Sequence, residues 1–128
     1  MYREKKFRCP VYDMQMCIIV TDNYKEINKR HDLEFEDIIF CHTVKGGIKI
    51  SSEKELRSCI YLIFNPKYKF EDRYLTHGVI AHECFHATNF LFMIIGAKPD
   101  INNDEPQAYL INYLVDQVED FIKPFWKQ

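Results

Sequence analysis

Residues 79–95 read VIAHECFHATNFLFMII, and this mostly apolar run is expected to form a buried helix. Within it, His82, Glu83 and His86 form the pattern H-E-x-x-H. Histidines four positions apart lie on one face of a helix, so both imidazoles can bind one metal ion, and the glutamate can act as general base toward a metal-bound water. The pattern therefore predicts a zinc-dependent hydrolytic centre.

The residues on either side of this run mark the ends of the helix. Thr76 or His77 can cap its N-terminus, and Gly96 is the residue type that best tolerates the left-handed conformation beyond a C-terminus. Cys84 lies two positions from each motif histidine and is expected to be a small core residue rather than a ligand.

A second helix is expected to begin at Asn102 or Asn103 and to continue to Pro124. Asp104 and Glu105 suit its first turn, where the helix dipole favours negative charge. Its apolar positions keep helical spacing and are expected to face the core; they are Ala108, Ile111, Val115, Val118 and Ile122.

Two segments before the motif helix are predicted to be strands. Residues 14–21 (MQMCIIVT) and residues 59–65 (CIYLIFN) are rich in β-branched and other apolar residues, which favours extended structure. After the first of these strands, Asp22 or Asn23 can cap a short helix that runs to about His31.

Between these elements, residues 35–44 predict another strand. Residues 45–47 (KGG) are a turn signal and residues 48–50 alternate in polarity, so a hairpin is expected here. Together the elements predict an α+β fold: a small mixed sheet of about three or four strands, one short N-terminal helix, and two C-terminal helices packed on the sheet.

Composition favours a single intracellular domain over residues 1–128. Hydrophobic residues make up 47% of the chain, which is enough for a core, and the net charge of -2 gives no electrostatic footprint for nucleic acid or anionic lipid. The five cysteines include no C-x-x-C pair and indicate a reducing compartment. No apolar run has the length of a signal-peptide core or membrane span, so we expect a cytoplasmic protein.

A catalytic zinc ion normally takes three protein ligands, so a third must be found. A third histidine of the metzincin type is excluded because Phe92 occupies its position, and no histidine follows His86 at all. The best remaining ligand is Glu105, 19 residues after His86, with Asp104 as its competitor. Glu105 is preferred because it shares a helix side with core-facing positions, whereas Asp104 could cap the helix or support a histidine.

The HECFH helix followed by NDEPQAY at residues 103–109 resembles the gluzincin-type zinc metallopeptidases, including compact HExxH…DExxAY proteins encoded by bacteria and their phages. The resemblance implies a zincin-like fold in which His82, His86 and Glu105 bind Zn²⁺ and Glu83 is the general base. The implied reaction is hydrolysis of a peptide or protein substrate. For a phage-encoded protein, the location would be the host cytoplasm or the virion.

The resemblance also suggests supporting roles. The thermolysin-like pattern has an aspartate where this chain has Tyr109, so Asp104 or Asp100 is expected to replace that carboxylate, and Tyr109 becomes a candidate oxyanion donor. A substrate strand could add to the edge of the sheet along residues 59–65 or the hairpin at residues 40–50.

A different class of function stays open: a zincin-like structural or interaction protein that keeps the metal without proteolysis. Glu83 favours the enzyme, because a purely structural site needs no base. Peptide deformylase is excluded, since Cys59 follows Arg-Ser rather than Glu-Gly. His42 and His77 are expected to be structural. So short a chain leaves little material to wall a substrate cleft, so a protein partner or an oligomer could complete it.

Overall fold

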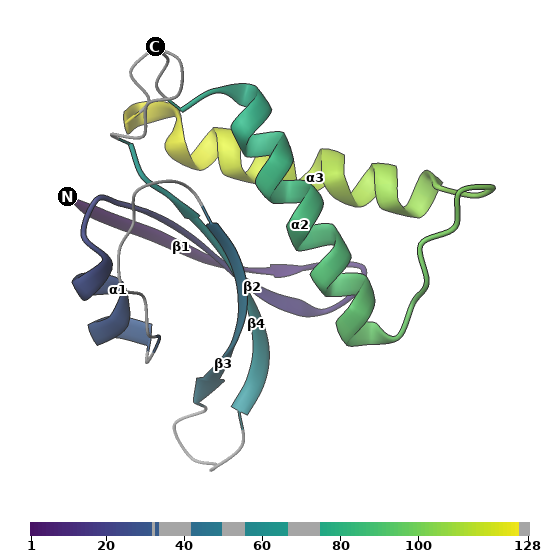
Figure 1. Cartoon of the computed structure of the whole chain (residues 1–128), viewed down its shortest axis with the longest axis horizontal. Helices are drawn as coiled ribbons and strands as arrows, with labels where there is room; N and C mark the ends of the chain where they lie inside the picture. Colours follow the sequence, from purple (N-terminus) through teal and green to yellow (C-terminus); the bar gives the residue numbers. More distant parts are fainter. Residues whose placement is uncertain (32, 34–41, 50–55, 67–74, 126–128) are drawn as a thin grey trace.

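The chain forms an α+β structure in which one mixed sheet is covered by helices on both faces (Figure 1). This computed structural model describes residues 1–31, 33, 42–49, 56–66 and 75–125. Helices α2 and α3 lie together on one face, and the short helix α1 lies on the other (Figure 1). The coarse α+β prediction is therefore confirmed.

The sheet has four strands in the order β1-β2-β4-β3. Strands β2 and β4 pair in parallel, whereas β1 pairs with β2, and β3 with β4, in antiparallel fashion. Both central strands are strongly apolar, as expected for strands that are covered on both faces. The strand bounds are β1 Tyr2–Cys9, β2 Met14–Thr21, β3 His42–Lys49 and β4 Leu56–Phe64.

Alternation along the strands separates two cores. The larger core lies between the sheet and the helices α2 and α3, and it includes Met16, Ile18 and Leu62. The smaller core faces α1 and contains Cys17, Ile19, Ile27, Cys59, Tyr61 and Ile63. Because successive side chains of a strand point to opposite faces, β2 contributes to both cores.

The helices are α1 Tyr24–His31, α2 His77–Ile95 and α3 Glu105–Ile122, followed by a 3-10 turn at Lys123–Phe125. The predicted caps of α2 are both present. The Thr76 hydroxyl accepts a hydrogen bond from the Val79 backbone at 3.2 Å, and Gly96 adopts the left-handed conformation with φ of 76°. The predicted bounds of α2 and of the strand at 14–21 are confirmed.

The predicted hairpin between residues 35 and 50 is wrong in its turn. Residues 45–47 are not a turn but lie inside β3, where Lys45 pairs with Ile60 and Gly46 with Cys59. Residues 34–41 and residue 50 lie outside the described residues. The glycine pair was a misleading signal, because glycine is tolerated in an extended edge strand as well as in a turn.

The sequence also did not predict β1. Its eight residues, YREKKFRC, carry four basic side chains, which are unfavourable for a buried strand but suit an exposed one. β1 lies at an edge of the sheet and pairs only with β2 among the described strands. The basic N-terminal segment is therefore a strand of the sheet.

Helix α3 is partly rotated relative to the prediction, which is confirmed at Val118 and Ile122. Its buried stripe runs along the positions Leu110, Leu114, Val118 and Ile122. Ala108, predicted to face the core, is exposed, and Ile111 is only partly buried. The helix begins at Glu105, with Asp104 as its N-cap residue, slightly later than predicted. Glu105 therefore shares a helix side with an exposed alanine rather than with the core.

By length and composition alone, α2 could cross a membrane, with a mean hydropathy of 1.3. Core helices of other proteins share this length and composition. In this structure α2 contacts β3, β4 and α3, and its buried apolar residues belong to the larger core. Packing thus accounts for part of its apolar character, and 39% of this stretch is buried.

Candidate metal centre

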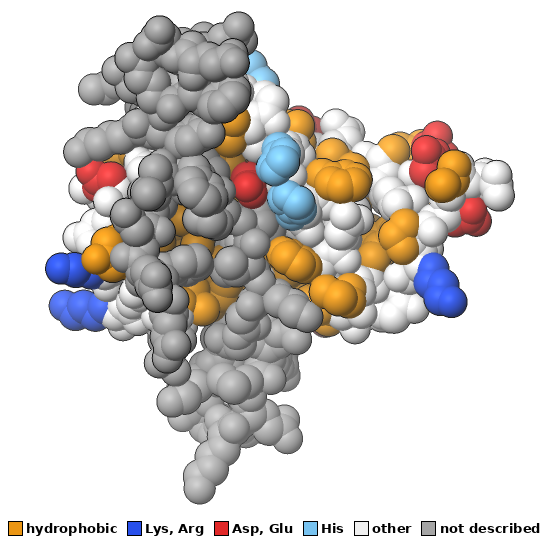
Figure 2. Space-filling model, in the orientation of Figure 1, with side chains coloured by type: hydrophobic (Ala, Val, Ile, Leu, Met, Phe, Trp, Pro, Cys, Tyr) orange, Lys and Arg blue, Asp and Glu red, His pale blue; other side chains and the backbone are white. Residues whose placement is uncertain are grey.

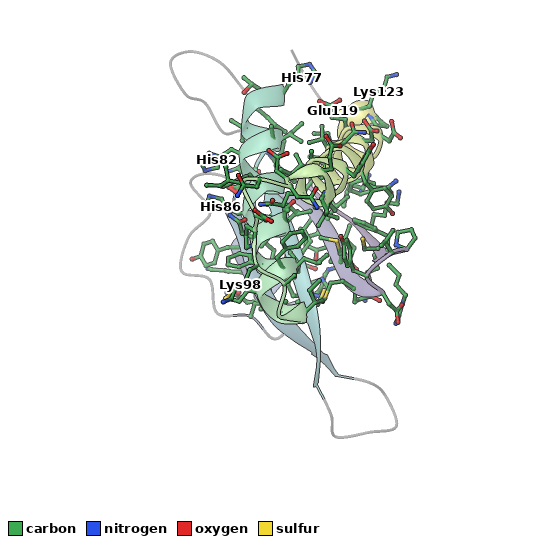
Figure 3. The ribbon with its side chains drawn as sticks, turned by 90° about the vertical axis from the view of Figure 1, so that its right-hand side faces the viewer. His77, His82, His86, Lys98, Glu119 and Lys123 are labelled. Carbon is green, nitrogen blue, oxygen red and sulfur yellow. The ribbon has the colours of Figure 1, made fainter. Side chains whose placement is uncertain are left out.

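His82 and His86 lie side by side on successive turns of α2. Their Nε2 atoms are 3.1 Å apart, and both side chains are exposed. Figure 3 shows the pair projecting from the side of α2 that faces away from α3. Two nitrogens bound tetrahedrally to one zinc ion at ~2.0–2.1 Å are separated by about 3.3 Å. The two imidazoles are therefore already spaced as ligands of one ion.

Glu83 lies beside this pair on the buried side of the helix. Its side chain is 5% exposed, although carboxylates are rarely buried without a partner. Glu83 does have an interaction partner in the structure, so it is not a free carboxylate. The H-E-x-x-H pattern thus places two exposed imidazoles next to one enclosed carboxylate.

Cys84 confirms its predicted role as a core residue. It is fully buried, and burial, followed by the nearby carboxylates of Glu83 and Glu119, raises the pKa of its thiol to about 12. The thiol is therefore protonated and unreactive at neutral pH. Since Cys84 belongs to the larger core, it lies away from the exposed histidine face.

Glu105 is not assembled with the histidine pair. Among the described residues, His82, His86 and Glu105 do not form a group whose ligand atoms all lie within 4.8 Å of one another, and the same holds with Asp104 or Asp100 in place of Glu105. All three acidic side chains are exposed. Among the described residues, the structure thus brings together His82 and His86 but not the predicted third ligand.

Exposed apolar side chains lie near the pair. Figure 2 shows two histidines next to each other on the surface, with exposed hydrophobic side chains nearby. Phe85, which follows in sequence, is 51% exposed, and its ring lies 6.3 Å from that of His86. Met93 on α2 and Tyr109 on α3 are also exposed.

His77 is separate from the pair. Its Nδ1 forms a short contact with Oε1 of Glu119 on α3, near the N-terminal end of α2 (Figure 3). This contact links the two helices, in agreement with the structural role predicted for His77. The side chain of His42 lies outside the described residues.

Of the two sheet edges predicted to accept a substrate strand, the one along residues 59–65 is not an edge. Strand β4, which contains residues 59–64, pairs with β2 on one side and β3 on the other, so it presents no open edge. Strand β3 lies at the edge of the sheet beside β4, and α2 contacts both strands. Of the described strands next to α2, only β3 offers backbone groups for strand addition.

A surface hollow lies at the start of α3. It has a volume of about 370 Å³ and is lined by Cys9, Pro10, Val11, Tyr12, Pro106, Tyr109, Leu110 and Tyr113. The lining is almost entirely apolar, and neither motif histidine contributes to it. Tyr109, predicted as an oxyanion donor, instead lines this hollow.

A second group of metal-ligating side chains lies on the other face of the sheet. Glu4, Cys17 and His31 each offer one ligand atom, and the three atoms lie within 4.8 Å of one another. Sequence reasoning missed this group because its members come from three elements and form no short motif. The register of β1 on β2 sets Lys6 opposite Cys17. Glu4 lies two residues before Lys6, on the same face of β1, and is therefore near the thiol.

Comparisons with known proteins do not identify a family. No protein-family model, curated protein or solved structure matches this chain.

Proposed function

We propose that this chain is a zinc-dependent hydrolase of zincin-like type that cleaves peptide bonds, with His82 and His86 as metal ligands and Glu83 as general base. The observation that carries the proposal is the 3.1 Å separation of the two exposed Nε2 atoms. The pair requires no rearrangement of α2 to bind one ion. The adjacent carboxylate of Glu83 is the residue type that this chemistry needs.

The proposed chemistry divides between the ion and the chain. A bound zinc ion would lower the pKa of a water ligand toward ~7 and polarise a carbonyl group. Glu83 would accept the proton of that water and return it to the leaving amine.

The surroundings of the pair support a peptide as substrate. The edge strand β3 lies under α2 and can pair with an extended chain through its backbone. The exposed ring of Phe85 beside His86 provides an apolar contact for a substrate side chain. Together these features favour an extended segment with apolar residues near the scissile bond.

The third ligand is proposed to be Glu105, with Asp104 as its alternative. Neither reaches the pair in the described structure, so binding must bring the first turn of α3 closer to α2. Both side chains are exposed at the end of the connection that follows Gly96. Replacing each separately, as Glu105→Gln and Asp104→Asn, identifies which one lowers zinc affinity.

The test of the proposal combines metal content with hydrolysis. Zinc per chain is measured by elemental analysis for the parent, His82→Ala and Glu83→Gln, with His77→Ala as a histidine control outside the pair. Cleavage of a mixed peptide library is followed by mass spectrometry. We expect one more zinc per chain in the parent, in Glu83→Gln and in His77→Ala than in His82→Ala, and cleavage only by the parent and His77→Ala.

Two results would contradict the proposal in different ways. If His82→Ala bound as much zinc per chain as the parent, the motif pair would not be a metal site. If Glu83→Gln cleaved peptides at the parental rate, Glu83 would not be the general base.

A non-hydrolytic metal-binding interaction protein is the second candidate. It is favoured by the absence of a third ligand beside the pair among the described residues and by the exposed ring of Phe85 next to His86. In that case, the parent and Glu83→Gln would both bind zinc and neither would cleave any peptide of the library.

A further inference from the structure

The group formed by Glu4, Cys17 and His31 lies on the α1 face of the sheet, opposite the H-E-x-x-H helix. Glu4 comes from β1, Cys17 from β2, and His31 is the last residue of α1. One ligand atom of each lies within 4.8 Å of the other two. Three separate elements therefore converge on one point.

Hydrogen bonds and ring contacts hold the imidazole of His31 in place. Its Nε2 lies 2.5 Å from Oε2 of Glu4 and 3.1 Å from the hydroxyl oxygen of Tyr2. The Tyr2 hydroxyl also donates to Glu4 at 2.8 Å. On the other side, the His31 ring meets the ring of Tyr61 edge-on, with centroids 5.1 Å apart. The orientation of the ligand atom Nε2 is thus fixed by its surroundings.

The group is largely enclosed. Cys17 is fully buried, and the side chains of His31 and Glu4 are 6% and 26% exposed. Partial burial would raise the pKa of Glu4, but hydrogen bonds from His31 and Tyr2 outweigh it, so the carboxylate is favoured. Burial, followed by the charge of Glu4, raises the pKa of the Cys17 thiol. A carboxylate and a neutral thiol therefore share one small space.

We propose that Glu4, Cys17 and His31 bind a divalent transition-metal ion of the Zn²⁺ class. The donor set decides the class, because a thiolate and an imidazole suit zinc-like ions, whereas calcium and magnesium prefer oxygen ligands. Binding replaces the proton of the Cys17 thiol, which is released to solvent as the sulfur–metal bond forms. His31 binds through the lone pair of Nε2 and carries its proton on Nδ1.

Such an ion would join β1, β2 and the end of α1, and so would stabilise the smaller core. This site is independent of the proposed hydrolase, because it lies across the sheet from His82 and His86 and shares no residue with them. The competing interpretation is a hydrogen-bonded group of Tyr2, Glu4 and His31 that binds no ion.

The experiment uses the full chain with the first site removed, His82→Ala/His86→Ala, so that failure of the hydrolase proposal does not affect it. Co²⁺ is added as the probe, and bound metal is counted by elemental analysis while the thiolate-to-cobalt absorption band is recorded. Cys17→Ala and Glu4→Gln are then introduced separately into this background. Cys84→Ala is the matched control, because it removes an equally buried cysteine on the opposite face.

We expect one Co²⁺ per chain with a thiolate band, loss of the band in Cys17→Ala, at least about tenfold weaker binding in Glu4→Gln, and no change in Cys84→Ala. Glu4→Gln also covers the case in which Cys17→Ala fails to fold, since Glu4 is partly exposed. Absence of bound Co²⁺, binding without a thiolate band, or equal affinity in Glu4→Gln would each overturn the proposal.

Discussion

The Nε2 atoms of His82 and His86 lie 3.1 Å apart across one turn of α2, with both rings on the exposed side of that helix. Without a metal, one imidazole can donate to the other only if each carries the correct tautomer. With a metal, both offer lone pairs to the same ion. The arrangement requires no distortion of the α2 backbone, because i and i+4 side chains meet on any helix.

Zinc is expected to stabilise the parent chain through this pair. At a free zinc concentration about 100 times the dissociation constant, linkage adds about 2.7 kcal/mol to the free energy of unfolding. For a domain of this size, this corresponds to a rise in Tm of roughly 8–15 °C. The rise should be reduced in His86→Ala and kept in His77→Ala, as measured by thermal unfolding with and without zinc. Equal rises in these two variants would show that zinc acts elsewhere.

Glu4 should make the stability of the apo chain depend on pH in the acidic range. Its pKa is lowered in the fold, where hydrogen bonds from His31 and Tyr2 outweigh partial burial. A lowered folded pKa gives stability that is present above the unfolded pKa of about 4.3 and is lost as pH falls through the folded value. In the presence of a chelator, Glu4→Gln should cost about 1 kcal/mol at pH 7 and less at pH 3.

Urea unfolding at pH 7, 5 and 3 measures this difference. Glu26→Gln is the control, because Glu26 forms an exposed i,i+4 pair with Arg30 and should cost no more than about 0.5 kcal/mol. A cost of Glu4→Gln that is the same at pH 7 and pH 3 would show that the carboxylate charge contributes nothing.

The cap of α2 provides a prediction about the helix that carries the motif. The Thr76 hydroxyl accepts a hydrogen bond from the Val79 backbone. Thr76→Ala removes that acceptor and should lower the free energy of unfolding by about 1 kcal/mol, whereas Thr76→Ser keeps it. Urea unfolding of both variants checks the difference, and equal losses would mean that the methyl group rather than the hydroxyl matters.

The elements that the sequence predicted correctly are those fixed by local chemistry. The bounds of α2 follow from Thr76 and Gly96, which act within one turn of the helix ends. Strand β2 follows from eight residues that are mostly apolar and β-branched. The H-E-x-x-H spacing likewise guaranteed that His82 and His86 would meet, because both positions lie on one helix.

What the sequence did not predict depends on contacts between distant segments. β1 is a strand because it pairs with β2, although its basic residues alone give no strand signal. The rotation of α3 follows from packing of the Leu110 stripe on α2, which left Glu105 on the exposed side. The grouping of Cys17 with Glu4 and His31 requires the strand register and the position of α1 together.

Two glycines at the ends of α2 should respond in opposite ways to the same substitution. Gly96 adopts φ of 76°, and an added Cβ would meet nothing within 4 Å, so the cost of Gly96→Ala comes from the left-handed backbone alone. That cost is about 1–2 kcal/mol, and Gly96→Asn should cost less because asparagine tolerates this conformation. Gly78 lies in the first turn, where an added Cβ would make an ordinary 3.7 Å contact with the Thr76 hydroxyl. Gly78→Ala should therefore raise the free energy of unfolding by up to about 1 kcal/mol. Urea unfolding of both alanine variants measures the two effects. A change of the same sign in both would contradict the described ends of α2.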